Sequence, residues 1–544
     1  MTGAGALLAA SLAMPLAMLA SCLSPRLRAR VPALLAIAPL PALAAALLAQ
    51  GGVFRLPPAL LRATLALDVP GAILLGSAAL LWVAAGRYAT ATLRGDAHAG
   101  RFAVWWLLTL TDSLGVFMAA DLVSFYLMFA MVSLAAYGLV VHDGTARARR
   151  AGVLYVSLAV LGEALLLMGF VLLAAATPGT SLLIADAVAA LPTSPWLETT
   201  LLLLILGFGL KLGLVPLHVW MPVAHPAAPI PASAVLSGVV VKAGVIGLIR
   251  FLPFQTALPG WGEALAAAGL FTAFYAVAVG ITQANPKTAL AYSTVSQMGL
   301  IATVLGMGLA GGDDRAVLGA SLYASHHILV KGALFLAVGV VQATGARGRW
   351  PVLLATAVLA LSLGGLPFTG GALAKLAVKL PLGDGGVGQF ATWSAAGTTL
   401  LMLHFLARLK QAAALDTQGP APARLVLPWL GAALASVAVP WALYLTVGGG
   451  TLPEALAPAT LWAAAWPVLA GGVLALALWR WGNRLPRCPE GDVVVLAEGA
   501  IGAARAAGVA MERVDALLRQ WPVAGVSLLA LAVILAVAML ATPG

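Results

Sequence analysis

Charged residues are scarce in this sequence. Asp, Glu, Lys and Arg make up only 9% of its 544 residues, whereas 62% are hydrophobic. A soluble domain of ordinary composition carries about 25% charged residues. Apolar runs of roughly 18–25 residues recur along the chain, and each is long enough to cross a bilayer as a helix. The shortage of charge excludes a soluble globular protein and predicts an all-α polytopic membrane protein.

Cysteine and the motifs of redox chemistry are also missing. Cys22 and Cys488 are the only cysteines, and their wide separation fits neither a metal site nor a CxxC redox pair. The sequence contains no haem-attachment motif and no glycine-rich dinucleotide loop. We therefore expect no cofactor, no metal and no catalytic residue in this chain. Whether it belongs to an enzyme stays open, because partner subunits can supply a driving redox reaction.

Long polar stretches are absent too, apart from residues 483–520. The apolar runs predict sixteen spans, which corresponds to about 14–16 transmembrane helices. The expected spans are 4–23, 31–50, 70–86, 102–119, 121–141, 152–176, 197–215, 231–252, 264–282, 288–309, 316–343, 352–380, 391–414, 424–446, 460–480 and 521–541.

Basic residues gather between the spans. The net charge is +11, and nearly all arginines lie in loops or at the ends of apolar runs. The positive-inside rule explains this pattern, so we expect no nucleic-acid partner. Basic loops alternate along the chain, for example at 26–30, 147–150 and 287, although Arg55 and Arg62 depart from the alternation. The pattern predicts a bacterial inner (cytoplasmic) membrane protein with both termini on the outer side.

Two spans are interrupted by glycine and proline. The span 197–215 runs into "VPLHVWMPVAHPAAPIP", and 352–380 contains "GGLPFTGGALAK". These residues should break the helix, and non-helical backbone at membrane depth survives only inside protein or beside a wet cavity. Each break falls in the fourth helix of a five-helix block, as in transporters built from inverted repeats. We expect N-terminal helices 1–101, repeats 102–252 and 264–414, and C-terminal helices 415–544.

The C-terminal part carries an amphipathic pattern. Residues 493–519 alternate apolar and charged positions at helical spacing. This predicts either a helix that lies on membrane lipid or a partner, or a plain connector helix. The final span is expected after it, at 521–541.

Lysine is placed where charge is otherwise avoided. Lys211, Lys242, Lys331 and Lys375 fall inside or beside apolar spans. A lysine near the middle of a span costs roughly 2.5–3.5 kcal/mol on insertion scales, so such residues are usually functional or paired. A lysine at a helix end can instead reach the headgroups, as we expect for Lys379. Arginine stays protonated, whereas a buried lysine can release and rebind a proton, so the four lysines predict a proton relay.

Histidines accompany these lysines. His218 and His225 lie in the first break, and His326 and His327 lie about one turn before Lys331. Histidine titrates near neutral pH and can pass a proton between its two nitrogens. No cysteine or carboxylate accompanies these residues at ligand spacing, which argues against a metal site.

Few carboxylates lie within the spans. Glu163, in the middle of an apolar helix, is the best candidate partner for a buried lysine, and Asp112 is the second. Asp121 is expected to cap the helix that starts at residue 122. His404, near a helix end, is expected to be a packed histidine.

The segment "KLGLVPLHVWMPVAHPAAPIPASAVLSGVVVKAGVIGLIR" (211–250) resembles the signature of the antiporter-like, proton-translocating membrane subunits of respiratory complex I, Mrp-type cation/proton antiporters and membrane-bound hydrogenases. "NPKTALAYSTVSQMGLI" (285–301), "SHHILVKGALFL" (325–336) and "GGLPFTGGALAK" (364–375) match further family motifs in the same order. The resemblance covers roughly residues 100–415. It implies two inverted five-helix repeats with a chain of buried lysines and histidines along the membrane midplane.

The resemblance also implies roles for the lysines. Lys211 matches the lysine of the first broken helix, and Lys242 matches the central lysine. Lys331 matches the link into the second half, and Lys375 matches the exit-side residue. One position departs from the family pattern: Ala130, in "FYLMFAMVSLAAYGLV", stands where the family has a glutamate that partners the first lysine. This departure suggests a divergent branch, in which either Glu163 or Asp112 replaces the partner or the first half-channel is altered.

These observations predict a proton-translocating membrane subunit of a multi-subunit complex. Its expected partners are other membrane subunits, with a peripheral soluble subunit and Na⁺ exchange as further options. Two other interpretations stay open. In the first, the chain is the membrane subunit of a two-component inorganic-carbon uptake system driven by proton flux. In the second, it is a non-conducting scaffold, and Ala130 is the sign that its relay no longer carries protons.

Overall fold

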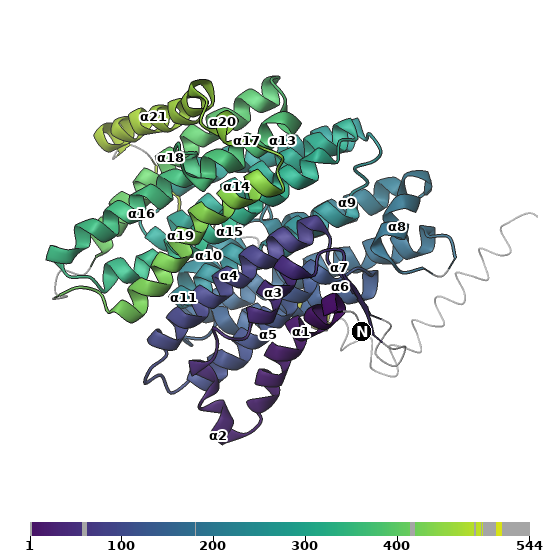
Figure 1. The fold of residues 1–544 in the computed structure, drawn as a ribbon, viewed down its shortest axis with the longest axis horizontal. Helices are drawn as coiled ribbons and strands as arrows, with labels where there is room; N and C mark the ends of the chain where they lie inside the picture. The colour runs from purple at the N-terminus through teal and green to yellow at the C-terminus, as the bar shows by residue number, and fades with distance from the viewer. Residues whose placement is uncertain are drawn as a thin grey trace, which may run out of the picture. The chain divides into compact units, whose positions relative to one another are not determined.

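The structure is a computed structural model that describes residues 3–56, 63–179, 181–413, 419–482 and 486–490, together with 492, 495 and 508–513. Within these ranges the chain is almost entirely helical (Figure 1). Eleven of the described helices are long and apolar enough to cross a membrane. The structure therefore confirms the expected all-α polytopic membrane protein.

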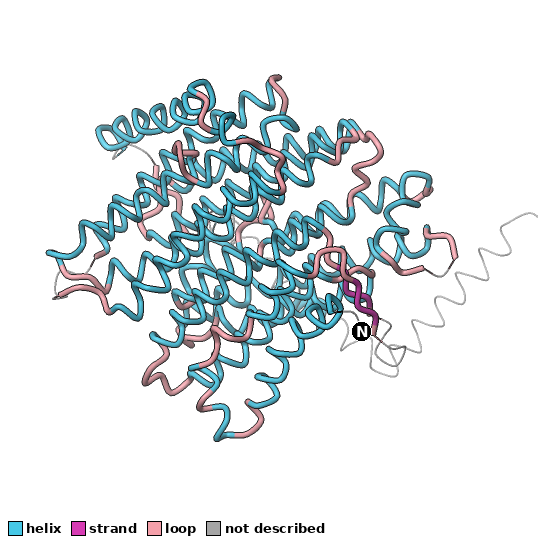
Figure 2. Tube along the Cα trace, viewed as in Figure 1, coloured by secondary structure: helices cyan, strands magenta, loops and turns pink. Residues whose placement is uncertain are grey.

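The N-terminal part departs most from expectation. Its elements are α1 (Gly3–Ser21), α2 (Pro25–Arg28), η1 (Val31–Ala33), α3 (Leu40–Leu48), β1 (Val53–Arg55), β2 (Thr64–Ala66) and α4 (Val69–Thr92). The span expected at 31–50 is not one helix, because Pro32, Pro39 and Pro41 lack the amide hydrogen that a continuous helix needs. The antiparallel hairpin β1–β2, drawn in magenta in Figure 2, has no counterpart among the expected elements.

A first block of five helical units follows. It consists of α5 (Ala99–Met118), α6 (Leu122–Val140), α7 (Ala146–Ala176), the pair α9 (Leu197–Leu212) and α10 (Trp220–Ala227), and a last unit made of α11 (Ile230–Val235), η4 (Leu236–Val240) and α12 (Lys242–Phe251). A short helix, α8 (Ile184–Ala190), and η3 (Leu191–Thr193) lie between α7 and α9. Asp121 caps α6 through Ser124, as expected, because its Oδ1 accepts the Ser124 amide at 2.8 Å.

The second block repeats this order. Its units are α13 (Pro259–Gly280), α14 (Pro286–Gly311), α15 (Arg315–Gln342), the pair α16 (Arg349–Gly364) and α17 (Gly370–Leu382) preceded by η5 (Ala346–Gly348), and α18 (Gly386–Ala412). The fourth unit is broken in both blocks, and each upstream half ends on a glycine with positive φ, Gly213 at 79° and Gly365 at 97°. Glycine adopts this left-handed conformation without steric cost. The repeat limits 102–252 and 264–414 stay predictions.

The remaining described helices are α19 (Ala423–Thr446), α20 (Leu452–Ala455) and α21 (Pro458–Trp481). Residues Met1–Glu490 form one compact unit and Gly491–Gly544 a second. The expected span 521–541 and most of the amphipathic segment 493–519 lie outside the described residues, although 508–513 are helical.

The centre of the first unit is formed by α15. This helix packs against α4, α14, α17 and α19, and its apolar window is entirely buried, as is that of the α11–α12 unit (Figure 1). By contrast, only 17% of the α21 window is buried. The two fully buried units are the ones that carry Lys242, His326, His327 and Lys331, so the charged residues sit where contact with lipid is excluded.

Candidate functional site

Lys242 and His327 meet at the centre of the fold. The Lys242 amine lies 2.5 Å from His327 Nδ1 and donates to the Ser237 carbonyl oxygen at 3.1 Å. Both side chains are fully buried. Ser237 belongs to η4, a π-helical turn directly before α12, and such turns are often found at functional sites. The contact joins α12 of the first block to α15 of the second.

Lys331 lies one turn beyond His327 on α15 and is bound by α14. Its amine donates to the Leu290 carbonyl oxygen at 2.8 Å and contacts the Ser293 hydroxyl. The side chain is fully buried. No carboxylate forms an ion pair with Lys242 or Lys331 among the described residues. Both amines are therefore held by oxygen and nitrogen acceptors that carry no full charge.

The two histidines of the first break differ in their surroundings. His225, on α10, is fully buried, and neither of its ring nitrogens has a hydrogen-bond partner within the described part of the chain. Its charged neighbours are Lys287, Lys331 and Lys242. His218 lies in the loop between α9 and α10, where its ring packs against Tyr275 and Tyr292. His225 thus lies among the lysines, whereas His218 lies in an aromatic setting.

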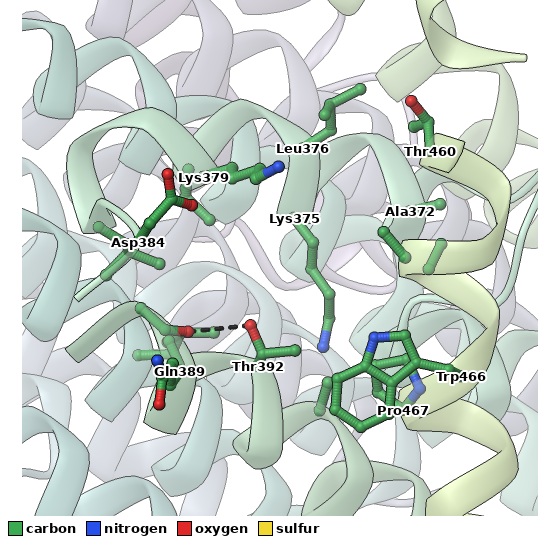
Figure 3. A pocket seen from close by; sticks show the side chains of 18 of the residues that line it. Ala372, Lys375, Leu376, Lys379, Asp384, Gln389, Thr392, Thr460, Trp466 and Pro467 are labelled. Carbon is green, nitrogen blue, oxygen red and sulfur yellow. Dashed lines mark hydrogen bonds between the residues drawn. The ribbon is translucent and has the colours of Figure 1, made fainter. Parts of the chain in front are cut away.

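The second break is reached from His326. Its Nε2 lies 2.9 Å from the Ser362 hydroxyl, near the end of α16, and Lys375 on α17 is its charged neighbour. Lys375 reaches into a cavity of about 380 Å³ between α17, α18 and α21, where its amine lies between Thr392 and Trp466 (Figure 3). Lys379 and Asp384 line the same cavity. Among the predicted relay residues, Lys375 is thus one that lines a cavity.

Lys211 is paired in the first half through a serine. Its amine donates to the Ser133 hydroxyl at 2.6 Å and lies 5.2 Å from the centre of the Phe129 ring. The Glu163 carboxylate, on α7, interacts with both Lys211 and Ser133. Glu163 Oε1 has no hydrogen-bond partner among the described residues. The structure thus brings Glu163 to the first lysine, with Ser133 of α6 between the two.

The second carboxylate candidate lies elsewhere. Asp112, on α5, is buried, but no charged group interacts with it and its Oδ2 lacks a hydrogen-bond partner in the described ranges. His404 is bonded to the backbone, because its Nε2 lies 2.8 Å from the Gln283 carbonyl oxygen. Across the described residues, no group of three His, Cys, Asp or Glu side chains could hold a metal ion.

Several polar residues that form side-chain hydrogen bonds inside the protein were not predicted from the sequence. The hydroxyls of Ser133, Ser293 and Ser362 each bond a lysine or histidine of the predicted relay, and Ser237 accepts from Lys242 through its backbone carbonyl. Tyr323, Gln297 and Thr398 form a chain from α15 through α14 to α18, with links of 2.6 and 2.9 Å. Serine and threonine are tolerated throughout membrane helices, so their positions alone carry little signal.

Comparisons with known proteins agree with this architecture. Residues 119–400 match a family model described as NADH:quinone oxidoreductase/Mrp antiporter, TM. A stretch of 229 residues is 35% identical to hydrogenase-4 component B of Escherichia coli (strain K12), covering 40% of this chain and 34% of that protein. Another comparison, with Na(+)/H(+) antiporter subunit A1 of Staphylococcus aureus (strain JH9), gives 31% identity over 314 residues, 53% of this chain and 39% of that protein. The matched regions thus span less than two fifths of either relative.

A solved structure extends the likeness to nearly the whole fold. The structure of the membrane-bound sulfane sulfur reductase, an archaeal respiratory membrane complex, contains a chain that aligns with a TM-score of 0.73. The alignment covers 97% of this chain and 99% of that one, at 21% sequence identity. At this identity the likeness concerns the fold alone.

Proposed function

We propose that this chain, which belongs to the NADH:quinone oxidoreductase/Mrp antiporter membrane family, moves protons across the membrane as one subunit of a larger complex. The contact between Lys242 and His327 supports this proposal most directly. It joins the two blocks at a point where both side chains are fully buried. A lysine and a histidine in direct contact can share and pass a proton, because each has a nitrogen that binds one reversibly.

The proposed relay has members in both halves. It consists of Lys211, His218, His225, Lys242, His327, Lys331, His326 and Lys375, with Glu163 as the carboxylate of the first half. Contacts support the steps from Lys211 to Ser133, from Lys242 to His327, and from His326 to Ser362 beside Lys375. Asp112 has no contact that supports a place in the relay, and we propose that it takes no part.

The insertion cost of these residues argues against a silent scaffold. A lysine near mid-membrane costs roughly 2.5–3.5 kcal/mol on insertion scales. Lys242 and Lys331 have no carboxylate to offset that cost among the described residues. A scaffold would be more stable with apolar residues at both positions. Proton transport gives a reason to keep them.

The proposal is tested by proton flux in membrane vesicles that carry the assembled complex. Lys242→Met keeps the length of the side chain but removes the proton-binding amine, so we expect at least a tenfold loss of flux. Lys410→Gln is a matched control, because this exposed lysine lies over the Trp350 ring at the end of α18, away from the relay. Equal flux in wild type and Lys242→Met would favour the scaffold interpretation.

Na⁺ is the second ion that the relatives suggest, because one of them is named as a Na⁺/H⁺ antiporter subunit. Exchange of H⁺ for Na⁺ is tested by repeating the flux measurement with a Na⁺ gradient across the vesicle membrane. A Na⁺ gradient should drive proton movement in the opposite direction if exchange occurs. Proton flux that is indifferent to Na⁺ would leave proton translocation as the function. The peripheral subunit and the membrane sides of the termini stay predictions.

A further inference from the structure

Lys287 is half-buried and bonds the backbone of another helix, although its position between two spans suggests a loop residue. It lies in the first turn of α14, with Asn285 as the cap. Its amine donates to the carbonyl oxygen of Pro226 at 3.3 Å and to that of Ala228 at 2.5 Å. These carbonyls belong to the end of α10, directly after His225. Lysine near a helix C-terminus offsets the negative end of the helix dipole, so this contact by itself is compatible with a structural role.

The surroundings of His225 suggest a functional role for Lys287 in addition to the structural one. His225 has Lys287 as one charged neighbour and Lys331 and Lys242 as the others. Both of its ring nitrogens lack hydrogen-bond partners within the described ranges, although the ring is fully buried. A buried polar atom without a partner costs about 1–3 kcal/mol and calls for an explanation. A shuttle provides one, because it needs one nitrogen to accept a proton and the other to release one.

Two charged residues, one in the α6–α7 connection and one at the start of α7, interact electrostatically with Lys287. Asp143 is exposed in this connection, and it interacts electrostatically with Lys287. Arg147, in the first turn of α7, is the other charged neighbour of Lys287. An exposed carboxylate can collect protons from water, whereas a guanidinium beside a lysine opposes its protonation.

Glu490 offsets that opposing charge. Its Oε2 accepts from Arg147 at 2.6 Å, and its Oε1 accepts from the Thr288 hydroxyl at 2.9 Å. Glu490 ends a short segment, residues 486–490, which we call the strap. A second bond holds the strap two residues earlier, where the Gln283 side chain donates to the Cys488 carbonyl oxygen at 3.1 Å. The strap thus connects Arg147 at the start of α7 to Gln283 and Thr288, which lie on either side of Lys287 in the sequence.

We propose that Asp143, Lys287 and His225 form a proton uptake site at the mouth of the relay, and that the 486–490 strap regulates it by neutralising Arg147 with Glu490. This inference rests on the proposed function and adds the point at which a proton enters. A proton moves from Asp143 to the Lys287 amine and then to one ring nitrogen of His225. The proton on the other ring nitrogen leaves toward Lys331 or Lys242, so the ring returns to its neutral state.

The uptake site is tested with substitutions at Lys287 in vesicles that carry the assembled complex. Lys287→Arg keeps a cation that can bond the Pro226 and Ala228 carbonyls, but arginine does not release its proton. We expect Lys287→Arg to assemble at the wild-type level and to lose at least tenfold in flux. Wild-type flux in Lys287→Arg would overturn the uptake site and leave Lys287 a structural role.

The two proposals fail in different ways. If wild type conducts and Lys242→Met does not, the proposed function stands, and full flux in Lys287→Arg then overturns only the uptake site. If wild type and Lys242→Met conduct equally, the proposed function fails first. Lys410→Gln serves as the control for a lysine substitution away from the proposed relay.

The strap is tested by suppression. Glu490→Gln leaves Arg147 without its counter-charge, so we expect flux to fall several-fold. Arg147→Gln in addition removes the opposing charge and should restore flux to near the wild-type level. A double variant that conducts no better than Glu490→Gln would overturn the regulatory role, because the strap would then act only by holding the structure together.

Discussion

Ala130 and Ser133 lie one turn apart on α6, and together they decide what Lys211 contacts. The resemblance implies a glutamate at position 130, where this chain has a methyl group. The lysine amine is bound instead by Ser133, and the nearest carboxylate is Glu163 on the neighbouring helix α7. A carboxylate on α7 thus lies beside this amine, where the resemblance implies one on α6. Under the proposed function, the first half therefore keeps a lysine, a hydroxyl and a carboxylate.

The replacement carboxylate is tested by an isosteric pair of substitutions. Glu163→Gln removes the charge that balances Lys211, and we expect at least a fivefold loss of proton flux. Asp112→Asn is the matched control, since this carboxylate is also buried but has no charged neighbour. We expect Asp112→Asn to conduct like wild type. The reverse outcome, with loss only in Asp112→Asn, would move the partner of Lys211 to α5.

Ser133 is a positioning residue between Lys211 and Glu163. Ser133→Ala removes the hydroxyl that accepts from the Lys211 amine at 2.6 Å. We expect a several-fold loss of flux and, because a buried donor loses its acceptor, a loss of about 1–3 kcal/mol in stability. Ser133→Thr keeps the hydroxyl and should restore flux. The readouts are vesicle flux and thermal stability in detergent; a flux deficit that Thr fails to rescue would contradict the role of the hydroxyl.

At the scale of elements, glycine ends the upstream half of each broken helix. Gly213 and Gly365 end the upstream halves with positive φ. The downstream half α17 then begins at Gly370 and Gly371, which press against neighbouring backbone: a Cβ on Gly371 would overlap the Ser362 carbonyl oxygen and approach His326. The second break is therefore a packed joint between α15, α16 and α17.

A methyl group at this joint should be costly. Gly371→Ala forces α17 away from α16, and overpacking of this kind costs typically about 1–3 kcal/mol. We expect a lower melting temperature together with reduced flux, because the Ser362–His326 contact lies at the same point. Gly431→Ala on α19 is the control, as nothing lies within 4 Å of its added methyl group. Equal melting temperatures for the two variants would show that the joint is not tightly packed.

Arg250 fastens the end of α12 to two other elements. Its guanidinium donates to the carbonyl oxygens of Val116, Phe117 and Ala119 at the end of α5, and to Asp68 at 2.9 Å, the cap of α4. Hydrogen bonds to a charged group contribute about 1.5–3 kcal/mol. We expect Arg250→Gln to lower the melting temperature of the purified protein by several degrees. Arg315→Gln, which removes an exposed pair with Asp313, should change it little.

At the scale of the whole molecule, the proposed relay crosses from one block to the other. Lys242 and His327 are 85 positions apart in sequence, and their fully buried side chains are in contact. If the two blocks conduct through this one contact, Lys242→Met and His327→Gln should cost about as much singly as together. Vesicle flux of the two single variants and the double variant measures this coupling. Losses that multiply would indicate independent paths through the two blocks.

The amino-acid sequence by itself determined the membrane character, the two broken helices and the set of buried lysines and histidines. These features follow from local chemistry: charge is excluded from lipid, proline and glycine interrupt helices, and an unavoidable charge in an apolar run stands out. The prediction of one span at 31–50 was wrong. Three prolines lie in this short apolar run, and apolar composition alone does not show where prolines interrupt a helix.

Only the tertiary structure decided which of these residues meet. Packing of separate helices assigned Glu163 rather than Asp112 to Lys211, placed His327 on Lys242, and supplied the serines that bind the relay. It also placed the Lys287 amine against the backbone at the end of α10. The physical reason is that a hydrogen bond depends on positions within about 3 Å, and the partners come from helices tens of residues apart in sequence.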